Sequence, residues 1–304
     1  MFTLVVPPES PCGCGSGRAF GECCLQNGHI RLSHKNIIPK PPRTGLSLKK
    51  CFLSDQNDCG GNMSGEHILS ASVLRNISND KISINGSNFS RTHSIQSDSL
   101  KTKCLCKRHN SAFSPIDTEA SRLFKTISLI EKILNGSIQS SQSLYFFAGF
   151  DIERWLLKAL FATYRSRITN INPDNYTLPC YLKYFFDTSF NPPYGLYLPA
   201  KFTSDEQFQF KMSTIAEASF GLITKNNLVS GITINLGGIE LKLMVAGTPS
   251  DLAAFQKTHV FRPKFINFYQ GDEVFSIALA WDKGTEQCVW ISRYDPTAPI
   301  PKDM

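Results

Sequence analysis

The sequence predicts a mixed α+β protein in which two small cysteine-rich modules precede a larger domain of helices followed by an antiparallel sheet. Eight of the ten cysteines fall within the first 106 residues, and helically spaced apolar residues follow from residue 116. Alternating apolar runs separated by turn residues then begin at about residue 180. A chain of 304 residues that is 41% hydrophobic is long and apolar enough for roughly two packed domains. We expect four segments: 1–35, 36–48, 49–120 and 121–304.

The amino-terminal stretch "MFTLVVPPES" has a short apolar run, no basic flank and a Pro-Pro stop, so it lacks the layout of a secretory signal. No stretch approaches the ~18 to 20 apolar residues of a membrane span. We therefore expect a cytoplasmic protein without membrane contact. Thiols stay reduced in that compartment, and clustered cysteines there hold a metal more often than they pair.

The first module, residues 1–35, contains "PCGCGSGRAFGECC" at positions 11–24. Cys12, Cys14, Cys23 and Cys24 form two close pairs whose thiolates can converge on one tetrahedral Zn²⁺ ion. This pattern resembles the SEC-C motif, a small zinc module that recurs as an appendage on bacterial proteins. The resemblance implies a structural zinc site and a knuckle that docks onto a protein partner.

Residues 36–48 include "NIIPKPPRTG", which is rich in proline and basic residues. Such a composition breaks helix and sheet and is typical of a semi-extended spacer. We therefore expect this segment to be a linker that lets the first module move independently.

The second module, residues 49–120, carries a second group of metal-ligating residue types. Cys51 and Cys59 form one half of a treble-clef or ββα-metal arrangement, and Cys106 with His109 forms the other. Cys104 lies two residues before Cys106 and could replace Cys59 as a ligand. The sequence thus predicts a second structural zinc site with one ligand left open.

Two signatures in this module, "SGEHI" (64–68) and "CKRHNS" (106–111), resemble those of the HNH endonuclease family, in the subfamily with S-x-E-H-I and C-x-x-C-N-S. The resemblance implies a ββα-metal, or His-Me finger, nuclease fold. It also implies that His67 is the general base and that Glu66 and Asn110 bind a catalytic Mg²⁺ or other divalent cation. A histidine with an ordinary pKa can deprotonate water at neutral pH, and Mg²⁺ favours oxygen ligands.

Three local patterns carry structural expectations of their own. Asn110 could cap the helix after the zinc ligand instead of binding a cation. Ser114, Pro115 and Asp117 have the layout of a capping box, which gives Asp117 a structural role. Asn85-Gly86 predicts the turn of an inserted hairpin ribbon.

Segment 121–304 begins with the rest of a helix that starts near residue 116 and ends before Gly136, followed by a helix over about 151–168. We expect the two helices to pack together. The strands beyond residue 180 predict an antiparallel sheet. The expected turns are Asn226-Asn227, Gly237-Gly238, Gly271-Asp272 and Lys283-Gly284. This segment shows no recognisable catalytic cluster.

Charge favours a nucleic-acid partner. The chain has a formal net charge of +7, and residues 1–120 carry 14 Lys and Arg against 9 Asp and Glu, a net of +5. A basic surface there favours phosphate contacts. The leading hypothesis is a metal-dependent endonuclease that hydrolyses phosphodiester bonds of nucleic acid, with DNA as the expected substrate and defence against foreign DNA as its role by analogy. The alternative is a non-catalytic, zinc-stapled interaction protein that docks through its SEC-C motif; the oligomeric state stays open.

Overall fold

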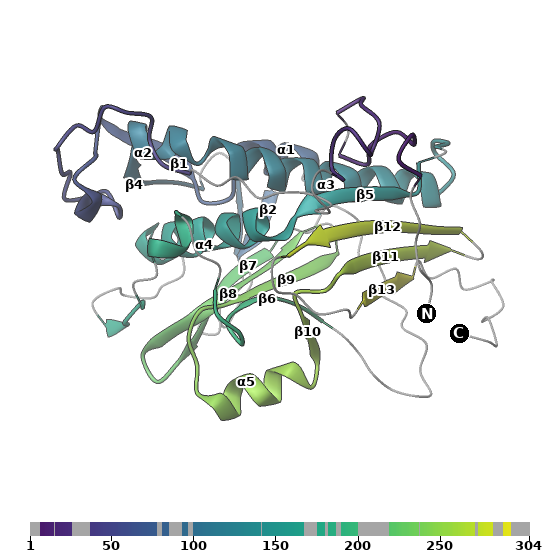
Figure 1. Ribbon diagram of the computed structural model, residues 1–304. Helices are drawn as coiled ribbons and strands as arrows, with labels where there is room; N and C mark the ends of the chain where they lie inside the picture. Colours follow the sequence, from purple (N-terminus) through teal and green to yellow (C-terminus); the bar gives the residue numbers. More distant parts are fainter. Residues whose placement is uncertain are drawn as a thin grey trace.

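The computed structural model has a two-stranded, a seven-stranded and a four-stranded β-sheet, with helices over the two larger sheets and a small cysteine-rich knuckle at one end (Figure 1). Among the described residues, no helix is both long and apolar enough to span a membrane. The residues that the structure describes are 7–14, 16–25, 37–77, 81–84, 93–96, 100–140, 142–166, 175–179, 182–186, 190–199, 219–236, 238–270, 273–281 and 288–292.

The second cysteine module is built on a two-stranded antiparallel pair. Strand β1 (Met63–His67) pairs with β4 (Lys101–Cys106), and helix α2 (Lys107–Ala112) follows directly. A short 3₁₀ helix, η2 (Ser54–Gln56), precedes the pair, and α1 (Ala71–Ile77) follows β1. In space β1, β4 and α2 are neighbours around the predicted metal ligands, although α1, β2 and β3 lie between β1 and β4 in the chain.

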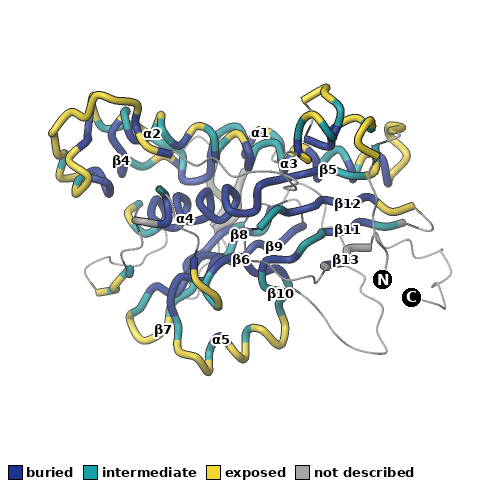
Figure 2. The backbone as a smooth tube through the Cα atoms, viewed as in Figure 1, coloured by how far each residue is buried: buried dark blue, intermediate teal, exposed yellow. Residues whose placement is uncertain are grey.

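Two long helices follow, as the apolar spacing predicts. Helix α3 (Ser114–Leu134) ends before Gly136, which has a positive φ of 76°. Helix α4 (Gly149–Ser166) packs against α3, which confirms the expected helix pair. Helix α4 is also covered by β4 and by strands of both sheets, so it is buried along almost its whole length (Figure 2). Its charged side chains must therefore find partners inside the protein.

The larger sheet has seven strands in the order β10-β6-β9-β8-β7-β2-β3. Strands β7, β8 and β9 form the predicted antiparallel meander. Asn226 and Asn227, which connect β7 to β8, both have positive φ, as a two-residue hairpin turn of type I′ requires. The strands are β10 (His259–Phe261), β6 (Gly195–Pro199), β9 (Ile239–Met244), β8 (Leu228–Leu236), β7 (Ser219–Lys225), β2 (Lys81–Ile84) and β3 (His93–Gln96).

The ribbon β2–β3 is antiparallel, as the inserted hairpin predicts, but its register differs from that expectation. Ile84 pairs with His93, so more residues connect the strands than the two of an Asn-Gly turn. Asn85 and Gly86 themselves lie outside the described residues. Strand β2 runs parallel to β7 and so joins the ribbon to the larger sheet.

The smaller sheet has the order β13-β11-β12-β5. The predicted pair β11–β12 is antiparallel, whereas β13 runs parallel to β11 and β5 runs parallel to β12. The expected antiparallel sheet is thus confirmed for β10, β6, β9, β8 and β7 of the larger sheet. It is wrong for β13 and β5 of the smaller sheet, because local alternation identifies strands without identifying their neighbours. The strands are β13 (Cys288–Ser292), β11 (Phe265–Gln270), β12 (Glu273–Ala280) and β5 (Leu144–Ala148); α5 (Pro249–Gln256) and the 3₁₀ helix η5 (Leu182–Phe185) complete the described elements.

Packing is continuous across the expected segment boundaries. One cluster of buried apolar residues extends from Ile37 to Val289, and residue 120 lies inside helix α3. Ile37 itself is fully buried, and the backbone of Leu46 accepts a hydrogen bond from Cys59. Residues 37–48 are therefore attached to the second module at these points, although most of the side chains from 40 to 47 are exposed.

The first module is docked onto strand β5, which corrects the expectation that it moves independently. Phe20 stacks on Phe146 with 4.9 Å between ring centroids, and the Phe146 N–H donates to the Gly13 carbonyl. Arg122 on α3 donates to the carbonyls of Cys14 and Phe146, tying the knuckle and the strand to the same helix.

This docking predicts a specific effect of a side chain at Gly13. A Cβ atom there would lie 2.6 Å from the Leu144 carbonyl oxygen and 2.8 Å from the Phe146 ring, so the knuckle must shift. Overpacking of this kind costs about 1–3 kcal/mol. We expect Gly13→Ala to lower the free energy of unfolding by that amount without loss of bound zinc. Gly65→Ala, where a Cβ atom meets nothing within 4 Å, is the matched control in urea titrations; equal stability of the two variants would contradict the docking.

Candidate metal centres

The first candidate centre consists of Cys12, Cys14, Cys23 and Cys24, as predicted. Their sulfur atoms all lie within 4.8 Å of one another, and none of these cysteines is in a disulfide. The Cys12 N–H donates to the Arg18 carbonyl at 2.8 Å and closes the loop that brings the two pairs together. Four thiols at this spacing fit a tetrahedral zinc ion.

The surroundings of these sulfurs favour deprotonation at one end of the cluster. Burial raises the pKa of Cys14, but contacts with Ser16, Cys23 and Cys12 outweigh it and lower the value to about 6. Burial and the neighbouring thiols raise the pKa of Cys24. Arg18 donates to the Cys23 sulfur at 3.3 Å, which adds positive charge at the rim. Since adjacent thiolates repel, a cation is needed to hold all four in their ligating form.

The second candidate centre consists of Cys51, Cys59, Cys106 and His109, all buried. The His109 Nδ1 atom lies 3.5, 3.8 and 3.2 Å from the sulfurs of Cys51, Cys59 and Cys106. Zinc–sulfur and zinc–nitrogen bonds of about 2.3 and 2.0 Å in a tetrahedron place such atoms about 3.6 Å apart. The geometry therefore matches a Cys₃His zinc site.

Cys59, and not Cys104, completes this cluster. Cys104 is buried with a pKa raised to about 12 by that burial, and the charged groups nearest it include Lys158 and Glu66. The Cys106 side chain caps helix α2 by accepting from the His109 N–H, and the Gly60 N–H donates to the same sulfur. One helical turn thus carries two ligands of the centre.

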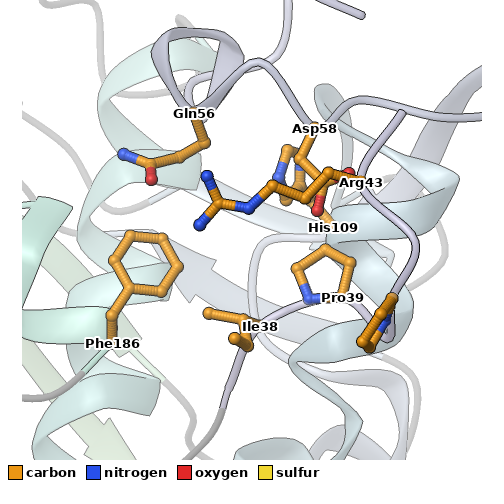
Figure 3. Close-up of a pocket in the computed structure, with 8 residues that line it drawn as sticks. Ile38, Pro39, Arg43, Gln56, Asp58, His109 and Phe186 are labelled. Carbon is orange, nitrogen blue, oxygen red and sulfur yellow. The ribbon is translucent and has the colours of Figure 1, made fainter. Parts of the chain in front are cut away.

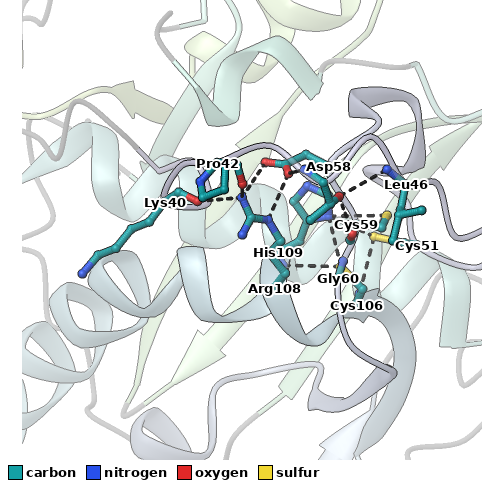
Figure 4. Close-up of polar contacts among 11 residues, drawn as sticks. Lys40, Pro42, Leu46, Cys51, Asp58, Cys59, Gly60, Cys106, Arg108 and His109 are labelled. Atoms are coloured by element: carbon teal, nitrogen blue, oxygen red, sulfur yellow. Dashed lines mark hydrogen bonds and ion pairs between the residues drawn. The ribbon is translucent and has the colours of Figure 1, made fainter.

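The proline-rich segment is fastened to this second centre through Asp58 and Arg108 (Figure 4). Arg108 pairs with Asp58 at 3.0 Å and donates to the carbonyls of Lys40 and Pro42 at 2.6 and 2.9 Å. Thr44 donates its N–H to Asp58 and its hydroxyl to the Cys59 carbonyl. Burial raises the pKa of Asp58, but Thr44 and Arg108 outweigh it and lower the value below its usual range. Residues 40–44 therefore form a strap across the centre.

The predicted catalytic residues lie in the same module. Glu66 and His67 end strand β1, opposite Thr102 and Lys101 of β4. Because consecutive strand residues point to opposite faces, these two side chains lie on different faces of the pair.

Asn110 is in helix α2, where its side-chain N–H donates to the Ser64 hydroxyl at 3.3 Å. Its Oδ1 atom is buried without a hydrogen-bond partner among the described residues.

The Glu66 carboxylate is engaged by a buried cation that sequence reasoning missed. Lys158 of α4, only 2% exposed in its side chain, lies 3.0 Å from Glu66 and 2.7 Å from Asp117. Burial alone lowers the pKa of Lys158, but the charges of Asp117 and Glu66 outweigh it and raise the value. The lysine is therefore a charged link between β1, α3 and α4.

Asp117 serves this link and does not cap a helix, so the predicted capping box is wrong. The residue before α3 is Phe113, in helical conformation and without a side-chain cap, because only one residue separates α2 from α3. Ser70 donates its hydroxyl to Asp117, and the Trp155 indole N–H donates to Ser70 at 3.0 Å. The sequence feature that could have indicated this link is a single lysine, Lys158, inside the apolar run of residues 155–161.

Comparisons with known proteins give no relatives: no family model, no curated protein and no solved structure matches the chain. Among the described residues, the two cysteine-rich clusters are the groups of His, Cys, Asp and Glu close enough to hold a metal ion. These two clusters are therefore the features of the described residues that point to metal binding.

Proposed function

We propose that this protein is a metal-dependent endonuclease in which a zinc-stapled strand-strand-helix unit presents His67 to a phosphodiester bond. The observation that carries the proposal is the arrangement around the second centre. β1 ends at His67, β4 pairs with it, and α2 carries the ligand His109 directly beside Asn110. A zinc ion here fixes the junction of β4 and α2, and so fixes Asn110 relative to the strand that bears His67.

His67 is the proposed general base. An imidazole at the end of a strand can accept a proton from water near neutral pH. A divalent cation bound near it would stabilise charge on the phosphate and on the leaving oxygen. Asn110 fits a role in holding that cation, because its Oδ1 atom is buried without a partner among the described residues. Glu66 does not fit that role as it stands, because Lys158 already neutralises it.

The surface of this module supports a phosphate backbone as the partner. Lys101, Lys103 and Lys107 are exposed on β4 and at the start of α2. Arg108 does not add to this surface, since it is bound to Asp58 and to the strap. Binding through these lysines predicts an affinity that falls as salt rises.

The proposal predicts cleavage that depends on His67. We expect the zinc-loaded protein to nick or linearise supercoiled plasmid at low salt with Mg²⁺ or Mn²⁺, and EDTA to stop the reaction. Removal of a general base lowers rates by about 10²- to 10⁴-fold, so His67→Ala should lose activity while still binding DNA. His259→Ala, which alters a histidine on β10 of the larger sheet, is the matched control and should cleave like the wild type. Equal rates for wild type and His67→Ala on DNA and RNA, or no cleavage by either, would refute the assignment.

A second candidate function is favoured by the Glu66–Lys158 pair. With its carboxylate neutralised inside the protein, the module can serve as a zinc-stapled scaffold whose SEC-C-like knuckle docks onto a partner such as the ribosome. This candidate predicts that His67→Ala behaves as the wild type in every cleavage assay. It also predicts that ribosomes co-sediment with the wild-type chain and not with the Cys12→Ser, Cys14→Ser double variant.

A further inference from the structure

A small pocket lies beside the second metal centre, on the side covered by the proline-rich segment (Figure 3). Its volume is about 190 Å³. The described residues that line it come from four parts of the chain: Ile38, Pro39, Pro41, Arg43, Gln56, Asp58, His109 and Phe186. The pocket therefore touches both the strap and one of the metal ligands.

His109, which lines this pocket, carries an unsatisfied polar atom. The residue is 1% exposed, and its Nε2 atom has no hydrogen-bond partner among the described residues. Its other ring nitrogen, Nδ1, faces the three sulfurs of the centre. A neutral imidazole that binds zinc through Nδ1 must carry its proton on Nε2. A ligand in the pocket that offers an acceptor atom would satisfy this buried N–H.

The charges around the pocket favour an anion. The Arg43 guanidinium extends into the space between Gln56 and Phe186 (Figure 3), and Arg43 has no ion pair with any residue that the structure describes. Asp58 is the acidic residue of the described lining, and Arg108 and Thr44 already satisfy it. The unpaired charge that faces the pocket is therefore positive.

The remaining walls are apolar. Ile38 is 47% exposed although it is a large hydrophobic side chain, and Pro39, Pro41 and Phe186 extend the same surface. Sites for drug-sized ligands have volumes of about 300–1,000 Å³, so this smaller pocket suits a compact molecule. An apolar body covers such walls while a charged group meets the arginine.

We propose that this pocket binds a small organic acid, with its carboxylate held by Arg43 and by the Nε2–H of His109 and its apolar body against Ile38 and Phe186. The site is separate from the proposed nuclease residues and does not depend on that function. Because His109 is also a ligand of the second centre, an occupied pocket adds a contact to the residue that holds the zinc. The proposal thus assigns a ligand site to the outer side of a structural metal centre.

The test is a calorimetric titration of the zinc-loaded full chain with benzoate, which joins a carboxylate to a compact apolar ring. Benzamide, its neutral counterpart, and inorganic phosphate, an anion without an apolar body, are the comparison probes. We expect saturable benzoate binding that is at least tenfold tighter than binding of either comparison probe. In parallel, ¹⁵N spectra of the histidine side chains should show a shift of the His109 Nε2–H signal on benzoate addition.

Two variants locate the binding. Arg43→Gln should weaken benzoate binding roughly tenfold, since hydrogen bonds to charged groups are stronger than neutral ones. Lys40→Gln removes a nearby positive charge whose side chain extends away from the centre in Figure 4, and it should bind as the wild type does. No saturable benzoate binding, equal affinity for benzamide or phosphate, or equal weakening by both variants would overturn the proposal.

Discussion

Replacing Cys59 by serine is expected to remove one of two zinc ions per chain and to lower the free energy of unfolding by more than about 3 kcal/mol. Structural zinc sites contribute binding free energies of about 10–16 kcal/mol in small zinc-binding domains, and a lost thiolate removes a large part of that. Cys59 is one of the four ligands within 4.8 Å of one another, and the strap lies against it. The second module should therefore lose both its metal and its packing.

Cys104→Ser is the matched control for this experiment. Cys104 is equally buried and lies in the same module, but it is outside the ligand cluster. A buried hydroxyl without a partner costs about 1–3 kcal/mol, so this variant should be moderately destabilised and keep both zinc ions. Elemental analysis and urea titration distinguish the two variants. Retention of two zinc ions by Cys59→Ser, or loss of one by Cys104→Ser, would contradict the ligand assignment.

The second large effect is expected at Arg262, which forms a fully buried ion pair with Glu153 of α4. The Arg262 Nε atom lies 2.8 Å from the carboxylate, and the two side chains are 0% and 2% exposed. Arg262 also donates to the Phe190 carbonyl, and its guanidinium lies over the Phe150 ring. Arg262→Met leaves an unpaired carboxylate in the interior, which typically destabilises by about 3–5 kcal/mol. We expect that loss at pH 7 in urea titrations.

The loss should shrink as the pH falls. Burial raises the pKa of Glu153 although Arg262 opposes the change, and without the arginine the value rises further. A carboxyl group with a raised pKa in the folded state favours folding when it is protonated. The stability difference between Arg262→Met and the wild type is therefore smallest below about pH 4.3, the pKa of a glutamate in the unfolded chain. It grows as the pH rises through the pKa of Glu153 in the folded protein.

Lys225→Met is the control for Arg262→Met, because it breaks an exposed ion pair with Asp251. The Lys225 side chain is 57% exposed, and such pairs contribute about 0–1 kcal/mol. Its effect should be small at every pH. A similar loss for the two variants, or a loss for Arg262→Met that does not change with pH, would refute the buried-charge explanation.

The metal ligands were predictable because ligand chemistry is local in sequence. Cys12 with Cys14, Cys23 with Cys24 and Cys106 with His109 are pairs within three residues, and short spacing restricts where their donor atoms can lie. Cys59 could be chosen over Cys104 only once the fold was known. Both are cysteines at acceptable spacings, and they differ in their surroundings: Cys59 lies beside His109, whereas the charges of Lys158 and Glu66 act on Cys104.

The buried charges of α4 were not predictable by the same reasoning. Charged residues between apolar ones on a helix normally indicate a solvent-exposed face. Lys158 contradicts that rule because its partners are distant in sequence: Asp117 is 41 residues away and Glu66 is 92 away. The parallel neighbours of β5 and β13 were missed for the same reason. The alternation of apolar and polar residues along a strand shows which of its faces is buried, but it does not show which strand lies beside it.

The knuckle on strand β5 has a consequence for the solubility of the protein. β5 is the last strand of the smaller sheet, so one side of its backbone is not paired with another strand of that sheet. Gly13 accepts from the Phe146 N–H on β5, and the Phe20 ring covers the Phe146 side chain. Unpaired strand edges recruit strands from other molecules and lead to aggregation. The first zinc centre thus protects a sheet edge, and we expect chelation of its metal to produce self-association before the rest of the fold is lost.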